Sequence, residues 1–348
     1  MNQSVFSSVI EAKLRPEVVR VQGNLYAACF FLMKLIPAHH ILIRAREEGS
    51  LAPGAAVIES SSGSFALALA MISRLSGFRL TLVSDPVIDE RLGRRLRDLG
   101  ATLDIVSTPA PVGGIQKARL DRLTELMRLR PNAYWPQQYE NLRNPESYGP
   151  TAESILGQLG RIDVLGGPVG SGGSVGGFAA ALRQSNPDLR VIGVDTFGSV
   201  LFGQKEGPRL LRGLGNSLMP GVLDHTLFDE VHWLSAAEAF RATRELHSST
   251  ALFQGPTSGA AWMVARWYAR RNPGSQVLVL CPDEGYRYLD DVYDDSWLRA
   301  KGVLLERGTP EPHWVTHPDE AGPPWAAIEW RRRTIQAVTG HEEGASSL

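Results

Sequence analysis

The chain has 348 residues, of which 43% are hydrophobic and 21% are charged, and its formal net charge is −1. This composition is typical of a soluble globular protein of about two domains. The near-neutral charge argues against nucleic acid or an anionic membrane as a partner, because such partners usually require an excess of basic residues. We therefore expect a small-molecule partner.

Cysteine use and the N-terminus indicate the compartment. Cys29 and Cys281 lie far apart and match no metal-binding or CxxC spacing, so we expect two buried thiols in a reducing interior. The N-terminus carries Glu11 and lacks the long apolar core of a signal peptide. The longest apolar run, residues 27–33, is too short to span a bilayer. These features predict a cytoplasmic protein.

The stretch from Phe30 to His40 places Lys34 inside an otherwise apolar segment, residues 27–38. One interpretation is a lysine whose stem lies on apolar surface while its charge stays in water. The other is a functional amine, because burial lowers the pKa of a lysine and favours the nucleophile that a Schiff base with a carbonyl cofactor requires. The stretch alone leaves both interpretations open.

Short β-rich runs alternate with helical patterns along the chain, which predicts an α/β protein with parallel sheets flanked by helices. The expected strands are residues 55–60, 79–85, 101–107, 163–167, 190–195 and 276–283. The expected helices are residues 65–75, 89–100, 114–130, 176–185 and 258–271.

The strands fall into two groups, divided near residues 145–154. We predict a large lobe from residues 1–44 and 146–308, a small mobile lobe from residues 45–145, and a ligand site between them. Residues 309–348 form a C-terminal extension whose end, 341–348, is expected to be disordered. Three tryptophans in the extension could cover a lobe or make a subunit contact: Trp314, Trp325 and Trp330.

Three polar turns precede predicted helices. The serines of "ESSSGSFALALA" offer hydroxyls and amides to a carboxylate, or simply cap the helix. In "GGPVGSGGSVGGFAAAL", glycines let backbone amides surround a phosphate at a helix N-terminus. In "FQGPTSGAAW", Thr257 and Ser258 again lie at a helix start. These turns are the candidate ligand sites.

Other site chemistries have weaker support. The glycine loop could serve a dinucleotide with Asp195 as the ribose partner, but Val175 breaks the GxGxxG spacing at its third glycine. No GxSxG elbow is present, which argues against a serine hydrolase. His313 and His317 have i, i+4 spacing, but a proline follows His317 and no acidic ligand motif accompanies them, so we expect no metal site.

Taken in order, these turns resemble the fold-type-II pyridoxal-phosphate enzymes of the cysteine synthase and cystathionine β-synthase family, over roughly residues 20–300. Residues 61–66 resemble the family's "TSGNTG" loop, residues 170–174 its "GTGGT" phosphate loop, and "QQYENLRNP" its "QQF.NP.NP" stretch. "KLIPAHHILIRAREEGSLAPG" keeps the spacing of the family's "KDRPA" segment. The resemblance implies a two-lobed fold like that of the tryptophan synthase β subunit.

The resemblance also implies roles for individual residues. Lys34 falls on the Schiff-base lysine of pyridoxal 5′-phosphate, and Thr257, or otherwise Ser258, would face the pyridine nitrogen. The phosphate would be held by Gly170, Ser171, Gly172, Gly173 and Ser174. Ser64 takes the place of an asparagine that contacts the cofactor. The substrate carboxylate would be received by Ser61, Ser62, Gly63 and Gln138.

Several positions depart from the family pattern. The family's "NPxGSxK" is shortened to "FFLMK", Ile36 stands where arginine is common, and "SFA" at residues 64–66 replaces "NTG". These changes predict a more apolar pocket and question the substrate specificity of ordinary cysteine synthases.

The implied reaction starts from L-cysteine or an O-activated L-serine, with Lys34 as the base at Cα and an aminoacrylate intermediate. Capture by a nucleophile gives β-replacement, as in a cysteine synthase, and hydrolysis gives pyruvate, ammonia and hydrogen sulfide, as in a cysteine desulfhydrase. A third variant joins an amino-acid nucleophile to phosphoserine in diaminopropionate synthesis. An NAD-dependent dehydrogenase and a catalytically silent binding protein remain as alternatives. We expect a homodimer.

Overall fold

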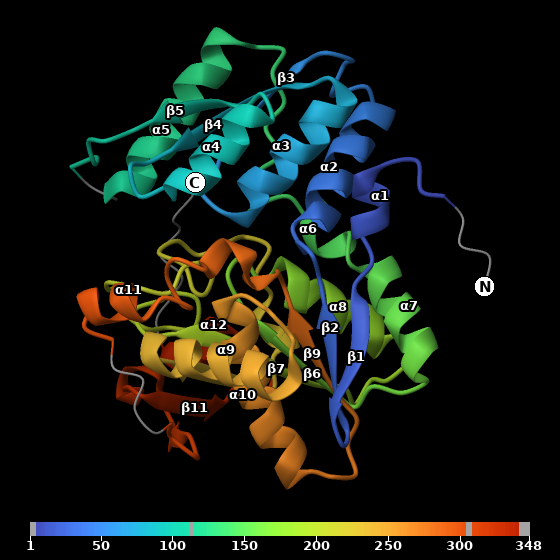
Figure 1. Cartoon of the computed structure of the whole chain (residues 1–348), viewed down its shortest axis with the longest axis vertical. Helices are drawn as coiled ribbons and strands as arrows, with labels where there is room; N and C mark the ends of the chain where they lie inside the picture. Colours follow the sequence, from blue (N-terminus) through green and yellow to red (C-terminus); the bar gives the residue numbers. More distant parts are fainter. Residues whose placement is uncertain (1–4, 112–113, 304–307, 341–348) are drawn as a thin grey trace. The chain divides into compact units, whose positions relative to one another are not determined.

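Figure 1 shows the computed structural model, which describes residues 5–111, 114–303 and 308–340. The described chain divides into two compact units. The smaller unit contains residues 5–14 and 32–147, and the larger unit contains residues 15–31 and 148–340. The predicted small lobe, residues 45–145, lies within the smaller unit, which also contains residues 5–14, residues 32–44 with Lys34, and residues 146–147.

The smaller unit is built on a three-stranded parallel sheet in the order β3, β4, β5. Its strands are β3 (Ala56–Ser60), β4 (Arg79–Ser84) and β5 (Thr102–Ile105). Its helices are α1 (Val9–Lys13), α2 (Leu35–Glu47), α3 (Ser64–Ser76), α4 (Glu90–Asp98), α5 (Gly114–Leu129) and α6 (Arg143–Glu146). Residue Val57 of β3 also bridges to Tyr134, so the segment after α5 runs beside β3.

The sequence explains these elements. β3 and β4 are short apolar runs that become buried, and α5 packs over them through Leu123 and Leu126. Helix α4 begins where the side chain of Asp89 accepts a hydrogen bond from the backbone N–H of Leu92. Helix α3 is apolar along most of its length and is almost entirely buried.

The larger unit contains an eight-stranded sheet in the order β1, β2, β9, β6, β7, β8, β11, β10. Strands β2, β9, β6, β7 and β8 are mutually parallel, whereas β1 and β11 run antiparallel to their neighbours β2 and β8. The strands are β1 (Glu17–Gln22), β2 (Leu25–Cys29), β6 (Val164–Pro168), β7 (Arg190–Thr196), β8 (Glu230–Leu234), β9 (Val277–Cys281), β10 (His313–Val315) and β11 (Trp325–Glu329).

Helices cover both faces of this sheet. The α-helices are α7 (Gly149–Leu159), α8 (Gly173–Arg183), α9 (Ala236–Thr250), α10 (Pro256–Arg271), α11 (Asp295–Ala300) and α12 (Ile335–Thr339), and the 3₁₀ turns are η1 (His225–Leu227), η2 (Gly285–Tyr288) and η3 (Pro318–Glu320). A Cβ at Gly166 would contact Ala265 of α10, and one at Gly167 would contact Val175 of α8. Because successive strand residues point to opposite faces, α8 and α10 lie on opposite sides of β6.

The predicted α/β fold with parallel, helix-flanked sheets is confirmed. All six predicted strands form, and the change of unit between Ser147 and Tyr148 falls inside the segment 145–154. Five strands were not predicted: β1, β2, β8, β10 and β11. No helix within the described residues is long and apolar enough to cross a bilayer.

The C-terminal extension completes the larger unit. β11 extends the sheet beyond β8, and both Trp325 and Trp330 are buried in this unit, whereas Trp314 is 41% exposed. Of the two predicted roles, covering a lobe is therefore the one that the structure shows for Trp325 and Trp330. The end that was expected to be disordered, residues 341–348, lies outside the described residues.

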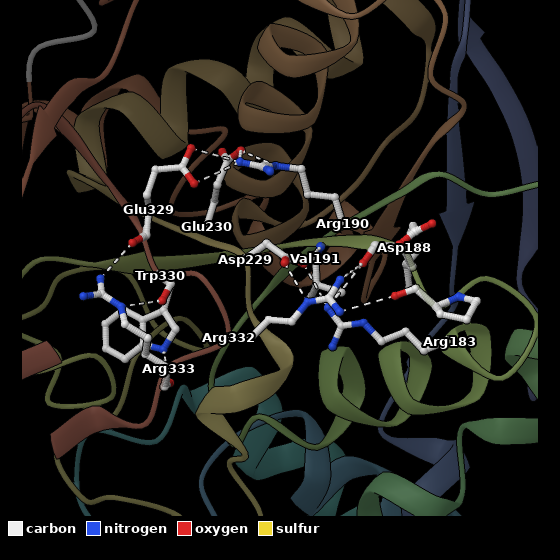
Figure 2. Close-up of polar contacts among 12 residues, drawn as sticks. Arg183, Asp188, Arg190, Val191, Asp229, Glu230, Glu329, Trp330, Arg332 and Arg333 are labelled. Atoms are coloured by element: carbon white, nitrogen blue, oxygen red, sulfur yellow. Dashed lines mark hydrogen bonds and ion pairs between the residues drawn. The ribbon is translucent and has the colours of Figure 1, made fainter. Parts of the chain in front are cut away.

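A network around Asp229 fastens the extension to the sheet (Figure 2). The Asp229 carboxylate accepts hydrogen bonds from Arg332 at 2.8 Å, Arg183 at 2.9 Å and the Val191 backbone N–H at 2.7 Å. The backbone N–H of Trp330 donates to the Asp229 carbonyl oxygen at 2.8 Å. One loop residue before β8 thus joins β7, α8 and the chain after β11.

A second group of polar side chains crosses three neighbouring strands (Figure 2). Arg190 of β7 donates to Glu230 of β8 at 2.6 Å and to Glu329 of β11 at 3.0 Å. Burial alone would raise the pKa of Glu230, but the hydrogen bond from His232 and the charge of Arg190 hold that pKa below its usual value. The ion pairs therefore compensate for a carboxylate buried in the sheet.

Candidate active site

Lys34 lies at the entry to α2, three residues after Phe31, where the chain passes from the larger to the smaller unit. The chain has five lysines, all within the described residues, and Lys34 is the one that is not exposed. Burial lowers the pKa of its amine to about 8. Its Nζ lies 6.0 Å from the ring centroid of Phe65 in the first turn of α3. The structure thus joins two sequence candidates, the lysine and the serine turn.

The serine turn connects β3 to α3 in the smaller unit. Gly63 occupies the N-cap position of α3, and no side chain caps this helix end. Simple N-capping, the alternative interpretation of the serines, is therefore not what the structure shows. Ser61 is buried, and its backbone N–H donates to Val83 of β4 at 3.2 Å. The positive end of the α3 dipole lies at this turn and favours an anion.

Gln138 lies near this turn, since both segments interact with the carboxyl of Glu59. It is buried, and its carbonyl oxygen accepts a hydrogen bond of 2.6 Å from the side chain of Asn144. The carboxyl of Glu59, at the end of β3, interacts with the backbone N–H groups of Gln137 and Gln138. Sequence reasoning missed Glu59, whose only signal was an acidic residue at the end of a buried strand.

The glycine loop joins β6 to α8 in the larger unit. Gly172 has φ +81°, and a Cβ there would lie 2.6 Å from Cδ1 and 3.0 Å from Cα of Leu223. It is the N-cap of α8, and no side chain caps this helix. Ser171 and Gly173 are buried, and the amides of the first helical turn have no partner inside the helix. This loop lies at the positive end of an eleven-residue helix, where the Gly173 N–H donates to the Ser171 hydroxyl at 3.4 Å.

A second loop, residues 213–217, holds the glycine loop in place. The Asn216 side chain donates to the Gly170 carbonyl oxygen at 3.3 Å, and the Gly215 N–H donates to Val169 at 2.8 Å. A Cβ at Gly213 would lie 3.4 Å from Cγ2 of Thr257. Thr257 and the glycine loop therefore both lie next to the segment 213–217. Asn216 was missed by the sequence analysis, which drew no prediction from the surrounding stretch "GLGNSLMPGVLD".

Thr257 and Ser258 begin α10, and both are buried. The Ser258 hydroxyl has no hydrogen bond of normal geometry among the described residues, although the thiol of Cys281 lies against it. Cys281 of β9 pairs in register with Cys29 of β2. Both thiols are free and buried, and the contact with Cys29 followed by burial raises the pKa of Cys281.

Asp195 lies in the interior of the protein, where its carboxylate is hydrogen-bonded to neighbouring residues. It is fully buried, and its carboxylate accepts a hydrogen bond from the Thr196 N–H at 2.8 Å. Burial raises its pKa to about 7, opposed by this bond, by the Ser199 hydroxyl and by the charge of Arg209. A ribose partner must be accessible to its ligand, so this environment does not fit the dinucleotide interpretation.

An α/β protein with an amine of lowered pKa and a glycine loop at a strand-to-helix junction has the features of an enzyme that uses a phosphorylated carbonyl cofactor. The family profile described as "Pyridoxal-phosphate dependent enzyme" matches residues 33–283. The chain therefore belongs to this family, and it is an enzyme whose cofactor is pyridoxal phosphate, as the sequence predicted.

Known relatives agree with this assignment. The chain is 42% identical to N-(2-amino-2-carboxyethyl)-L-glutamate synthase of Cupriavidus metallidurans, over 88% of this chain and 94% of that protein. It is 41% identical to the enzyme of the same name from Ralstonia nicotianae, over 75% and 78%. A solved structure of a hydrogen sulfide-producing enzyme from Fusobacterium nucleatum has a TM-score of 0.76 and 26% identity, and covers 82% of this chain and 100% of that one.

The structure fits this cofactor on two grounds. The cradle at Gly170–Gly173 has no space for a Cβ at Gly172, which is expected where backbone amides must surround a phosphate. The one lysine that is not exposed has a lowered pKa, which is what attachment to a carbonyl group requires.

Substitution of Gly172 tests the cradle. We expect Gly172→Ala to weaken pyridoxal phosphate binding by about tenfold or more and to lower the free energy of unfolding by about 1–3 kcal/mol, because a Cβ there meets Leu223 at a positive φ. Titration of the apoprotein with the cofactor measures the affinity. Gly176→Ala, also on α8, is the control, since its Cβ would lie 3.4 Å from Leu227 of η1. Equal affinities of the two variants would contradict the assignment.

Proposed function

We propose that this enzyme joins the amino group of L-glutamate to Cβ of an O-activated L-serine, giving N-(2-amino-2-carboxyethyl)-L-glutamate. The observation that carries the proposal is the identity of 41% and 42% to two synthases of that name, over 75% and 88% of this chain. In the reaction, the bond from Cβ to the activating oxygen breaks and a bond from Cβ to the glutamate nitrogen forms. The activating group leaves with a proton from the amine.

The proposed cofactor contacts come from four segments. When bound, pyridoxal phosphate supplies a sink for the electron pair released at Cα. Lys34 would carry it, Ser64 would contact it, and Thr257, or otherwise Ser258, would face its pyridine nitrogen. The phosphate would be held by Gly170, Ser171, Gly172, Gly173 and Ser174. A hydroxyl partner holds a ring nitrogen less strongly protonated than a carboxylate would, which suits loss of a β-substituent.

The proposed substrate contacts lie at the N-terminus of α3. Ser61, Ser62 and Gly63 would bind the α-carboxylate together with Gln138, and the positive end of the α3 dipole favours an anion. Lys34 would take the proton from Cα. Because burial lowers its pKa to about 8, a useful fraction of this amine is neutral near neutral pH.

One observation favours a second function. The Fusobacterium nucleatum structure, at 26% identity, belongs to an enzyme that produces hydrogen sulfide. A desulfhydrase would release the β-substituent of L-cysteine and give pyruvate and ammonia. The higher identity to the two glutamate-derived synthases makes β-replacement the preferred function.

Product analysis separates these functions. The purified holoenzyme is given L-glutamate with O-phospho-L-serine or with O-acetyl-L-serine, and in parallel sulfide with the same serines and L-cysteine alone. We expect mass spectrometry to find N-(2-amino-2-carboxyethyl)-L-glutamate only when L-glutamate is present. Cysteine formed from sulfide, with no glutamate adduct, would make the protein a cysteine synthase. Pyruvate and hydrogen sulfide from L-cysteine alone would make it a desulfhydrase.

A further inference from the structure

A buried carboxyl group stands directly before the serine turn. Glu59 is 3% exposed, and its Oε1 accepts hydrogen bonds from the Ser60 backbone N–H at 2.8 Å and from Trp135 Nε1 at 3.1 Å. The backbone N–H groups of Gln137 and Gln138 interact with the same carboxyl, yet Oε2 has no hydrogen bond of normal geometry among the described residues. A buried acidic group with an unsatisfied oxygen is costly and calls for a reason.

The segment that faces Glu59 is itself strained. Gln137 has φ +55°, a left-handed conformation that costs a side chain other than glycine about 1–2 kcal/mol. The turn is closed by hydrogen bonds of 2.9 Å from the N–H groups of Glu140 and Asn141 to the Gln137 carbonyl oxygen. Asn144 then holds the Gln138 carbonyl oxygen at 2.6 Å. The result is that Gln138 becomes buried next to β3 while Gln137 remains exposed.

Glu59 therefore connects two segments that are distant in the sequence. On one side its carboxyl holds the first N–H of the serine turn, and on the other it faces the amides of residues 137 and 138. These are the two segments from which the proposed function draws its contacts to the substrate carboxylate. The groups that shift the pKa of Glu59 are backbone N–H groups and the Trp135 indole, so within the described part of the chain no ion pair explains its burial.

We propose that Glu59 is a positioning residue that holds the Ser60–Gly63 turn and Gln138 in register, so that both segments bind the α-carboxylate of the amino-acid substrate. This inference rests on the proposed function of that site. Burial raises the pKa of Glu59 to about 7, so the carboxyl takes up a proton far more readily than a usual glutamate and can remain beside an anion.

Two variants separate positioning from folding. In Glu59→Gln, Oε1 can still accept from Ser60 and Trp135, but an NH₂ donor replaces the second oxygen and the negative charge is lost, so the interaction with the amides of residues 137 and 138 should weaken. In Glu59→Ala both contacts are lost. Asp104→Asn is the control, because Asp104 is a carboxylate on β5 that pairs with Arg122.

The measurement compares two ligands that differ only in the carboxylate. L-serine and ethanolamine are titrated into each holoenzyme, and binding is followed by the visible spectrum of the cofactor. We expect wild type and Asp104→Asn to prefer L-serine strongly, and this preference to fall about 3- to 10-fold in Glu59→Gln and further in Glu59→Ala, with ethanolamine binding unchanged. In steady-state assays KM for the serine substrate should rise more than kcat falls.

The outcomes distinguish the two proposals. If wild type prefers L-serine and both Glu59 variants keep that preference, the positioning role is wrong and the proposed function stands. Equal losses for L-serine and ethanolamine would show a general structural role and also overturn the inference. If wild type itself does not distinguish the two ligands, the proposed carboxylate site fails, and the role of Glu59 fails with it.

Discussion

Replacing Lys34 with alanine is expected to lower the rate of product formation by about 10³-fold or more. Under the proposed function, the variant loses both the amine that carries the cofactor and the base at Cα. Lys117→Ala is the matched control, because Lys117 is an exposed lysine of α5 that pairs with Asp121 of the same helix. It should leave the rate unchanged.

Chemical mapping tests the same assignment without an activity assay. Borohydride treatment of the holoenzyme fixes the cofactor to the lysine that carries it, and peptide mass analysis then distinguishes the five lysines of the chain. We expect the label on the peptide that contains Lys34 and none in the Lys34→Ala protein. A label on another lysine, or a fully active Lys34→Ala variant, would show that the family alignment is wrong at this residue.

The apoprotein provides a pH-dependent test of the environment of Lys34. Burial lowers its pKa from 10.5 to about 8, so the unfolded chain binds more protons at this residue than the folded chain between these pH values. The stability of the wild-type apoprotein should therefore rise with pH across that window. Lys34→Met should be more stable by about 1–3 kcal/mol below pH 8, and this advantage should vanish toward pH 10.5.

The departures from the family pattern explain this environment. The sequence predicted a more apolar pocket from Ile36 and Phe65, and both side chains are buried. Phe65 stands 6.0 Å from the Lys34 amine in a position where the family pattern has threonine. An aromatic ring removes water from the amine without offering a hydroxyl, which favours the neutral form of the lysine.

Parallel strands could be predicted from the sequence because they are continuous apolar runs. β8 escaped prediction since Glu230 and His232 make "EVHWL" look polar, although both side chains are buried and bonded to each other at 3.0 Å. Two further hydrogen bonds satisfy these polar groups. Trp325, 93 residues from His232, donates to that histidine, and Arg190, 40 residues from Glu230, donates to that carboxylate. The hydrophobic periodicity of a short sequence segment cannot indicate hydrogen-bond partners that are so distant in the chain.

The candidate site also contains some residues that the sequence indicated and others that it did not. The lysine, the serine turn and the glycine loop could be recognised because each is a short contiguous motif whose spacing is preserved. Glu59 and Asn216 could not, because their importance comes from contacts across the chain, with residues 135–138 and with Gly170. Such supporting residues become visible only when the fold brings the segments together.

Trp325 gives the largest expected effect on stability. It is 2% exposed on β11, and its Nε1–H donates to Nδ1 of His232 at 3.1 Å, which leaves the proton of His232 on Nε2 to donate to Glu230. Trp325→Ala should lower the free energy of unfolding by about 3–5 kcal/mol through the cavity alone. Trp325→Phe should cost about 1–3 kcal/mol, because the ring is mostly retained but Nδ1 of His232 loses its donor.

The control for this prediction lies in the same extension. Trp314 on β10 is 41% exposed, so Trp314→Ala should cost about 1 kcal/mol or less, although its ring lies 5.8 Å from that of His232. Urea unfolding of the three variants and the wild type, all as apoproteins, measures the differences. Because β11 forms the connection between β8 and β10, a large loss at Trp325 means that the extension folds together with the sheet. Equal small losses at both tryptophans would mean that the extension is an appendage whose burial contributes little.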